Sequence, residues 1–199
     1  MKPTLCIDVD STIWDTGSWI SSAVLDITGE TLDRDKITTW THLLDTYGEE
    51  TTISIFDRVF DPARIRDRKP YPGASEVLRA LKERSGIELH FVTHNDPQTM
   101  PPRLEPWLKT HFGPGVGLTV TTEDKLGILQ RLGAFGLIDD MPDTLVRVAD
   151  AGLWAAARVQ PWNRDLLARR SAVHGFTDWQ EVPNLLPPNL KPEACNRAR

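Results

Sequence analysis

The chain has 199 residues, a formal net charge of −5 and a hydrophobic fraction of 40%. This length suits one α/β domain with room for an inserted subdomain, and the hydrophobic content is sufficient for a buried core. The negative charge excludes a broad basic surface for nucleic acid or anionic membrane, so a small anionic substrate would need a local positive site.

The first predicted element is a buried strand that stops where two acids begin. The segment TLCIDVDST (4–12) has a short apolar run followed by Asp8 and Asp10. Their side chains project to the same side of an extended chain, and like charges this close raise each other's pKa unless a cation lies between them. Mg²⁺, a hard cation that prefers oxygen ligands, is the expected partner. The alternative is an ordinary strand end with a turn aspartate and a solvated neighbour.

Three helices are predicted next, over 18–28, 36–47 and 50–60. Apolar residues recur there at roughly helical spacing, and strand-like alternation is absent from 14 to 70. This pattern predicts a small helical cap inserted after the first strand. The run RIRDRK (64–69) is expected to be a solvated face at the cap hinge, with a local anion funnel as the alternative.

From Pro70 onward, strands alternate with helices. Strands are expected at 87–93, 117–122, 134–138 and 153–159. Helices are expected at 77–86, 103–112, 124–132, 144–152 and 178–186. This alternation predicts an α/β fold with a doubly wound parallel sheet and helices on both faces.

The chain is expected to divide into a core, an inserted cap and a flexible tail. These parts are 1–13 with 71–186, then 14–70, and finally 187–199. A disulfide between Cys6 and Cys195 is not expected, and neither a signal peptide nor a membrane-spanning stretch is evident. The sequence therefore predicts a soluble cytoplasmic protein, and leaves a homodimer open.

Polar residues suited to phosphate chemistry stand at four predicted strand ends. They are Asp8 and Asp10, then Thr93, then Lys125, and last the acidic group Asp139, Asp140 and Asp143. In doubly wound sheets, ligands bind beyond the carboxyl ends of the strands, where the strand order reverses. We therefore expect these side chains to meet, with Asp139 and Asp140 completing a metal site across from the first strand.

The chemistry that these residues suit is phosphoryl transfer, which needs a nucleophile, a cation and fixed donors to the phosphate oxygens. Asp8 suits a carboxylate nucleophile that forms an aspartyl-phosphate. Asp10 suits the acid that protonates the leaving group and later activates water. Thr93 offers a hydroxyl donor, and Lys125 a fixed positive charge.

The order of these residues resembles the haloacid dehalogenase superfamily of phosphohydrolases. DVDST (8–12) matches its DxDx(T/V) first motif, and IDDMPD (138–143) its acidic fourth motif. Thr93 matches the strand-end Ser/Thr between them, and Lys125 the lysine. The resemblance implies a Rossmann-like core with a cap and a Mg²⁺-dependent phosphatase activity.

Longer stretches resemble the 5′(3′)-deoxyribonucleotidase family, which has a helical cap after the first motif and acts on deoxynucleoside monophosphates. They are 70–95, WLKTHFGP (107–114), LTVTTEDK (118–125) and LIDDMPD (137–143). Asp15 also fits that family's acid a few residues beyond the DxD. The chain departs from the family pattern at Ser11, where glycine is usual, at His94, where serine is usual, and at Thr16, where an aromatic residue is common.

The resemblance implies roles for the acids. Asp8 would be the nucleophile and a Mg²⁺ ligand, and Asp10 would be the acid/base and bind the metal through its carbonyl. Asp140 is the preferred third ligand, Asp139 is the alternative, and Asp143 would support the ligands from behind.

Substrate contacts are expected from the catalytic loops and the cap. The predicted substrate-binding residues are Ser11, Thr12, Trp14, His94 and Asn95. The candidates for stacking on a nucleobase are Trp14, Trp19, Trp40, Phe56 and Phe60. For most of these aromatic residues the alternative is the cap's own core, and for His94 and Asn95 it is a structural turn.

The sequence favours a phosphomonoesterase for nucleoside monophosphates, specifically a 5′(3′)-deoxyribonucleotidase. One alternative is a polynucleotide 3′-phosphatase, because 137–159 resembles the phosphatase domain of phage-type polynucleotide kinases. Another is a small-metabolite phosphatase of the same superfamily. A receiver-type phosphoacceptor module is disfavoured because the DxD lies on the first strand and Asp10 is present to drive hydrolysis. A catalytically silent binding protein is disfavoured because none of the expected catalytic residues is missing.

Overall fold

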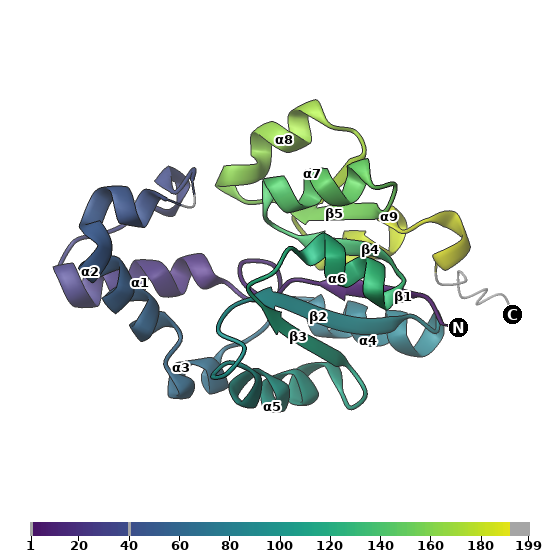
Figure 1. The fold of residues 1–199 in the computed structure, drawn as a ribbon, viewed down its shortest axis with the longest axis horizontal. Coiled ribbons are helices and arrows are strands. Elements are labelled where there is room, and N and C mark those ends of the chain that lie inside the picture. The colour runs from purple at the N-terminus through teal and green to yellow at the C-terminus, as the bar shows by residue number, and fades with distance from the viewer. Residues whose placement is uncertain (1, 40, 192–199) are drawn as a thin grey trace, which may run out of the picture.

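A parallel β-sheet forms the centre of the molecule (Figure 1). The computed structural model describes residues 2–39 and 41–191, and over these residues the sheet has six strands in the order β3-β2-β1-β4-β5-β6. The strands are β1 (Thr4–Ile7), β2 (Glu88–His94), β3 (Gly117–Thr121), β4 (Ala134–Asp139), β5 (Trp154–Arg158) and β6 (Val173–Phe176). All neighbouring pairs run parallel, and the order reverses between β1 and β4. The predicted doubly wound sheet is confirmed, with a switch point at the end of β1.

Helices cover both faces of the sheet, as the alternation of side chains along β1 requires. Leu5 and Ile7 point into the core of one face, whereas Cys6 points into the core of the other. The first face is covered by α4 (Ala74–Arg84), α5 (Pro101–Phe112), η3 (Trp179–Glu181) and α9 (Val182–Leu185). The second is covered by α6 (Lys125–Leu132), α7 (Pro142–Asp150) and α8 (Arg164–Arg169). Two short 3-10 helices, η2 (Pro161–Asn163) and η4 (Pro188–Leu190), lie after β5 and α9.

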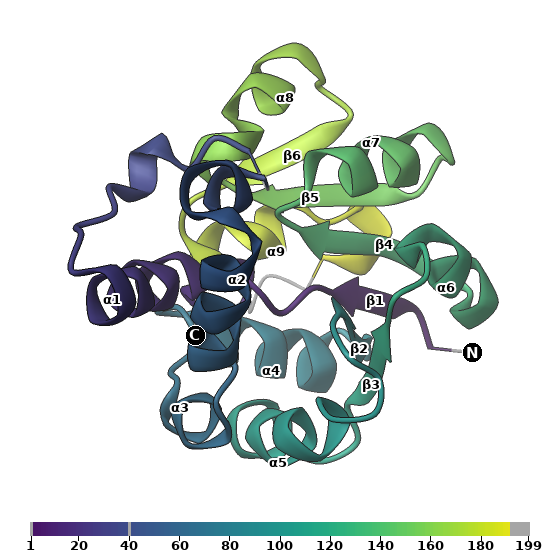
Figure 2. The same ribbon diagram turned by 60° about the vertical axis from the view of Figure 1, so that its left-hand side comes forward.

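A helical insertion follows β1, as predicted. It consists of α1 (Thr16–Thr28), η1 (Arg34–Lys36), α2 (His42–Val59) and α3 (Pro62–Asp67). α1 and α2 pack together through an apolar cluster of their own, formed by Ile20, Ala23, Val24, Leu43, Ile55 and Val59. Figures 1 and 2 place both helices beyond the end of β1 at which the chain leaves the sheet. We call residues 14–70 the cap below, and the boundaries of core, cap and tail stay a prediction.

The cap differs in detail from the expected helices. The chain is not helical from residue 36, since only a 3-10 turn forms there, and α2 begins at His42. As predicted, a helix ends at Gly48, because α2 consists of two helices that meet at a kink there; Gly48 has φ 74° and ψ 172°, a conformation that glycine adopts without a side-chain clash. The run 64–69 is not a solvated face throughout, because α3 forms there and buries Ile65 and Arg68.

Three elements of the structure, α3, α8 and β6, were not predicted from the sequence. The segment VHGF of β6 is only four residues long, contains a glycine and is buried at its two ends only. The strand pairs with β5 at the edge of the sheet, so its formation depends on a neighbour already in place. The helix expected over 178–186 forms as two short pieces, η3 and α9.

Candidate active site

The carboxyl ends of β1, β2 and β4 meet at a cavity of about 310 Å³ under the cap. Five of the predicted catalytic and metal-binding residues line it: Asp8, Asp10, Thr93, Lys125 and Asp140. The remaining lining residues are Thr16, Phe56, Phe60, His94, Asn95 and Met141. The structure therefore brings together residues that lie far apart in the sequence, at the switch point of the sheet.

Lys125, the first residue of α6, links two of the acids. Its Nζ lies 2.5 Å from Oδ1 of Asp8 and 2.8 Å from Oδ2 of Asp139, and all three side chains are buried. Burial raises the pKa of the Asp8 carboxyl to about 7, since the attraction of Lys125 does not offset desolvation together with repulsion from Asp139 and Asp10. Burial alone would lower the pKa of Lys125, but the two carboxylates outweigh it and raise that pKa.

The adjacent acids Asp139 and Asp140 have different surroundings. Oδ1 of Asp139 accepts the backbone N–H groups of Asp140 and Met141, and its Oδ2 accepts from Lys125, so both oxygens are engaged. Among the described residues, Asp140 accepts a hydrogen bond at Oδ2 alone, from the indole N–H of Trp162 at 3.0 Å. Burial raises the pKa of Asp140, and repulsion from Asp8 and Asp139 raises it further.

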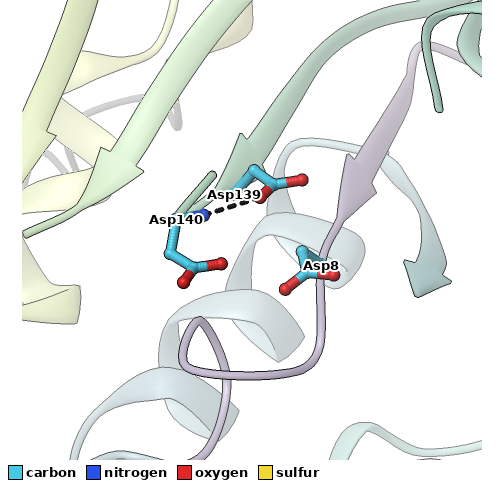
Figure 3. A group of neighbouring side chains, drawn as sticks. All are labelled: Asp8, Asp139 and Asp140. Atoms are coloured by element: carbon cyan, nitrogen blue, oxygen red, sulfur yellow. Dashed lines mark hydrogen bonds between the residues drawn. The ribbon is translucent and has the colours of Figure 1, made fainter. Parts of the chain in front are cut away.

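Three carboxylates thus gather around one lysine. Oxygens of Asp8, Asp139 and Asp140 lie within 4.8 Å of one another, which is close enough for a shared cation. Figure 3 shows the carboxylates of Asp8 and Asp140 turned toward each other. A site with this excess of negative charge and oxygen donors fits a divalent cation such as Mg²⁺.

Asp10 is held by three donors at the rim of the cavity. Its Oδ1 accepts from the indole N–H of Trp14 at 2.9 Å and from the hydroxyl of Thr16 at 3.0 Å. Its Oδ2 accepts from the hydroxyl of Thr93 at 3.3 Å. The turn that follows uses Ser11 with a φ of 55°, the left-handed region, and this reverses the chain so that Trp14 can reach back.

Three predicted substrate-binding residues, Ser11, Thr12 and Trp14, do not line the cavity. Ser11 and Thr12 are buried, and the Ser11 backbone is engaged by Thr16 and Gln160 instead. Trp14 is 1% exposed and does not line the cavity, because it packs edge-on against another tryptophan at 4.7 Å and supports Asp10.

His94, Asn95 and two cap phenylalanines line the cavity, and their contact with a substrate stays a prediction. His94 also bonds through Nε2 to the backbone carbonyl of Glu123 at 2.6 Å, so that this nitrogen carries the proton. Phe56 and Phe60 stack with ring centroids 6.3 Å apart and form the apolar wall of the cavity. Of the other stacking candidates, Trp19 packs against the cap cluster, and Trp40 lies outside the described residues.

Two further acids do not join the cluster. Asp15 is the N-cap of α1, where it accepts from the backbone and side chain of Ser18, and it pairs with Arg34 at 2.7 Å. Asp143 is exposed in the first turn of α7 and does not line the cavity. Neither position supports a role at the metal.

No family model and no curated protein matches the sequence. Solved structures match nearly all of it. CbbY from Rhodobacter sphaeroides, solved with xylulose 1,5-bisphosphate, has a TM-score of 0.62 and 17% identity over 91% of this chain and 96% of its own. A HAD-superfamily hydrolase of subfamily IA, variant 1, from Geobacter sulfurreducens has a TM-score of 0.57 and 18% identity, over 94% of this chain and 97% of its own. A haloacid dehalogenase-like hydrolase from Xanthomonas campestris has a TM-score of 0.61 and 14% identity, over 92% and 96%.

The chain has the haloacid dehalogenase fold. At these identities the likeness establishes the architecture, while the nucleotidase resemblance and the roles of the residues stay predictions. No helix in the described part of this haloacid dehalogenase fold is both long and apolar enough to cross a membrane.

Three residues that hold the site in place, Gln160, Trp162 and Asn163, were not predicted from the sequence. Trp162 and Asn163 of η2 fix Asp140, the first through its carboxylate and the second through its carbonyl at 2.9 Å. Gln160 fixes the Ser11 turn. These residues follow the end of β5, so the strand-end rule that located the other site residues would also have pointed to them.

Proposed function

We propose that this protein is a Mg²⁺-dependent phosphomonoesterase that works through an aspartyl-phosphate on Asp8. The observation that carries the proposal is the buried Asp8–Lys125–Asp139 ion-pair chain, which opens onto the same cavity as Asp10 and Asp140. A buried acid with its pKa raised to about 7, beside a fixed cation and at the switch point, is the arrangement expected of a reaction centre.

In the first step, an oxygen of Asp8 attacks the phosphorus, and the bond from phosphorus to the ester oxygen breaks. The protonated carboxyl of Asp10 gives its proton to that oxygen as it leaves. In the second step, Asp10 takes a proton from water, the water oxygen attacks phosphorus, and Asp8 and inorganic phosphate are released. Lys125 keeps Asp8 oriented and tempers its repulsion of the anionic substrate.

The side chains present fit Mg²⁺. Asp8 and Asp140 would hold it, with the Asp10 carbonyl as a further ligand, whereas Asp139 is occupied in holding Lys125 and two backbone N–H groups. When bound, Mg²⁺ supplies positive charge for the phosphoryl oxygens. The Thr93 hydroxyl has a single proton, which it donates to Asp10 in the structure, and it would turn to donate to the same oxygens when substrate binds.

We further propose that the substrate is a nucleoside monophosphate, as in a 5′(3′)-deoxyribonucleotidase. The cavity joins an acidic floor to an aromatic wall of Phe56 and Phe60, and its volume of about 310 Å³ suits a small molecule. A nucleobase stacks on such rings irrespective of its identity. His94 and Asn95 also line the cavity, where they would contact the sugar.

A phosphate-release screen tests both statements. The panel is p-nitrophenyl phosphate, 2′-deoxynucleoside 5′- and 3′-monophosphates, a sugar phosphate and a 3′-phosphorylated oligonucleotide, each with Mg²⁺ and with EDTA. We expect Mg²⁺-dependent release, fastest from a monophosphate and abolished in Asp8→Asn. Preference for the oligonucleotide end would replace the nucleotidase with a 3′-phosphatase, and preference for the sugar phosphate would indicate a small-metabolite phosphatase. Absence of turnover on every substrate would overturn the proposal.

A further inference from the structure

A buried arginine lies where the cap rejoins the core. Arg68 follows α3, and its side chain has no exposed surface. The guanidinium carbon lies 4.3 Å from the ring centroid of Trp14, 5.3 Å from that of Trp19 and 5.5 Å from that of Phe60. Arg68 is therefore enclosed by aromatic rings from the start of the cap, Trp14 and Trp19, and from the end of α2, Phe60.

Most of the Arg68 guanidinium is buried without a hydrogen-bond acceptor among the described residues. One nitrogen, Nη2, donates to the carbonyl of Val59 at the end of α2, while Nε and Nη1 are buried without an acceptor among the described residues. A buried donor without a partner costs stability. Burial lowers the pKa of Arg68 to about 10, and the nearby Asp10 carboxylate opposes that shift, so the group is charged at neutral pH.

The contacts of Arg68 lead to the proposed acid/base on one side and to the substrate wall on the other. Trp14, against which Arg68 stacks, donates its indole N–H to Oδ1 of Asp10 at 2.9 Å. The carbonyl of Arg68 accepts from the indole of Trp107, whose ring packs against Trp14. Phe60 lines the cavity.

We propose that Arg68 is a positioning residue, which holds Trp14 and through it the Asp10 carboxyl in register with the cap wall that carries Phe60. The inference rests on the proposed function, because it assigns Arg68 to the protonation of the leaving group. Arg68 does not line the cavity and touches no reacting atom.

The test compares substrates that differ in their need for a general acid. p-Nitrophenolate leaves without protonation, whereas the sugar oxygen of deoxythymidine 5′-monophosphate needs a proton. The quantity to compare is kcat/KM, because it reports the phosphoryl-transfer step. In Arg68→Met we expect the value for deoxythymidine monophosphate to fall by about tenfold or more, and that for p-nitrophenyl phosphate to fall by less than about threefold.

Trp14→Phe, which removes the indole donor, should show the same unequal loss. The double variant should lose little more than either single one, because the two residues act in one chain. The matched control is Arg66→Met, since Arg66 lies on the adjacent α3, is 77% exposed and pairs only with its neighbour Asp67 among the described residues. We expect this variant to match the wild type on both substrates.

An equal loss on both substrates would show a merely structural defect and overturn the proposal, as would unchanged values in Arg68→Met. If Arg68→Met does not fold, Arg68→Lys keeps the charge but removes the planar fork, and the same comparison applies.

Exchange of the Trp14 indole proton with deuterated water separates this inference from the proposed function, because it needs no turnover. Trp14→Phe assigns the signal among those of the seven tryptophans. Faster exchange in Arg68→Met than in Arg66→Met supports the positioning role even if no substrate of the panel is hydrolysed. Equal exchange in both variants would overturn it.

Discussion

Asp139 and Asp140 are neighbours in sequence with the same side chain, and their hydrogen bonds give them different tasks. Asp139 uses both oxygens internally, on Lys125 and on two backbone N–H groups. Asp140 has one oxygen that accepts no hydrogen bond from the described residues. Its carboxylate is turned toward Asp8 (Figure 3). The resemblance of IDDMPD to the superfamily motif makes Asp140 the preferred metal ligand and Asp139 the alternative, and the hydrogen bonds of the two acids support that prediction.

This difference predicts opposite phenotypes for two conservative substitutions. Asp140→Asn should weaken Mg²⁺ activation at least tenfold while changing stability little, because it removes a ligand charge. Asp139→Asn should lower the free energy of unfolding by about 3 kcal/mol, because it leaves the buried Lys125 with one fewer carboxylate. Mg²⁺ titrations of activity and urea unfolding check both. Equal loss of Mg²⁺ affinity in the two variants would contradict the assignment.

The raised pKa of Asp8 predicts how Mg²⁺ and pH act together. The folded protein binds this proton more tightly than the unfolded chain, so the contribution to stability is complete below the ordinary pKa of 3.8 and is lost as pH rises through about 7. A cation favours the ionised form and reverses that loss. The rise in Tm produced by Mg²⁺, relative to EDTA, should therefore grow from pH 5 to pH 8, and should be much smaller in Asp8→Asn. A rise that is the same at both pH values would be inconsistent with this account.

The helices and strands that could be predicted from the sequence are those marked by a pattern within their own residues. An apolar run that ends in acids marks β1 and β4, and Thr93 marks the end of β2, so the acids, the threonine and the lysine could be placed at one edge. The edge strand β6 could not be predicted from the sequence. Its four residues show no clear alternation of apolar and polar side chains, and the strand depends on pairing with β5. The direction in which the Trp14 side chain points could not be predicted either, since that direction follows from the turn at Ser11.

A substitution at Gly48 tests whether the kink in α2 is required for stability. Its φ of 74° with ψ of 172° is nearly restricted to glycine, although a Cβ atom added there would meet no other atom within 4 Å, so the cost is in the backbone alone. Gly48→Ala should lower the free energy of unfolding by about 1–3 kcal/mol. Gly133→Ala, at φ 60° and ψ 33° with similar open space, should cost less, since alanine tolerates that region better. Denaturant unfolding measures both, and an unchanged stability in Gly48→Ala would show that the kink is not required.

At the scale of the whole molecule, the cavity is shared between the core and the cap. The core supplies the acids and Lys125, whereas the cap supplies Phe56 and Phe60. Arg103 of α5 donates to the carbonyl of Phe60 at 3.0 Å, so the core also holds the end of the helix that forms the wall. Under the proposed function, the core carries the reaction and contacts the sugar through His94 and Asn95, whereas the cap contacts the base.

This division predicts that changes in the aromatic wall of Phe56 and Phe60 alter KM for nucleotides more than KM for small phosphate esters. Phe60→Ala should raise KM for a deoxynucleoside monophosphate by about tenfold, equivalent to roughly 1–3 kcal/mol of stacking. KM for p-nitrophenyl phosphate should change less. Ile53→Ala is the control, because Ile53 lies on α2, the helix that leads to Phe60, but is 54% exposed. Steady-state kinetics on the two substrates check this, and equal effects on both would argue against a base-stacking wall.

The central claim, that the phosphoryl group is transferred to Asp8, is tested most directly in Asp10→Asn with Mg²⁺ and p-nitrophenyl phosphate. The first step should proceed without a general acid and the second should stall without a base. The account predicts a burst of one equivalent of p-nitrophenol, and after acid quenching a phosphoryl group on the peptide that contains Asp8. Wild-type turnover with no phosphoryl group detectable on that peptide, and undiminished turnover in Asp8→Asn, would contradict it.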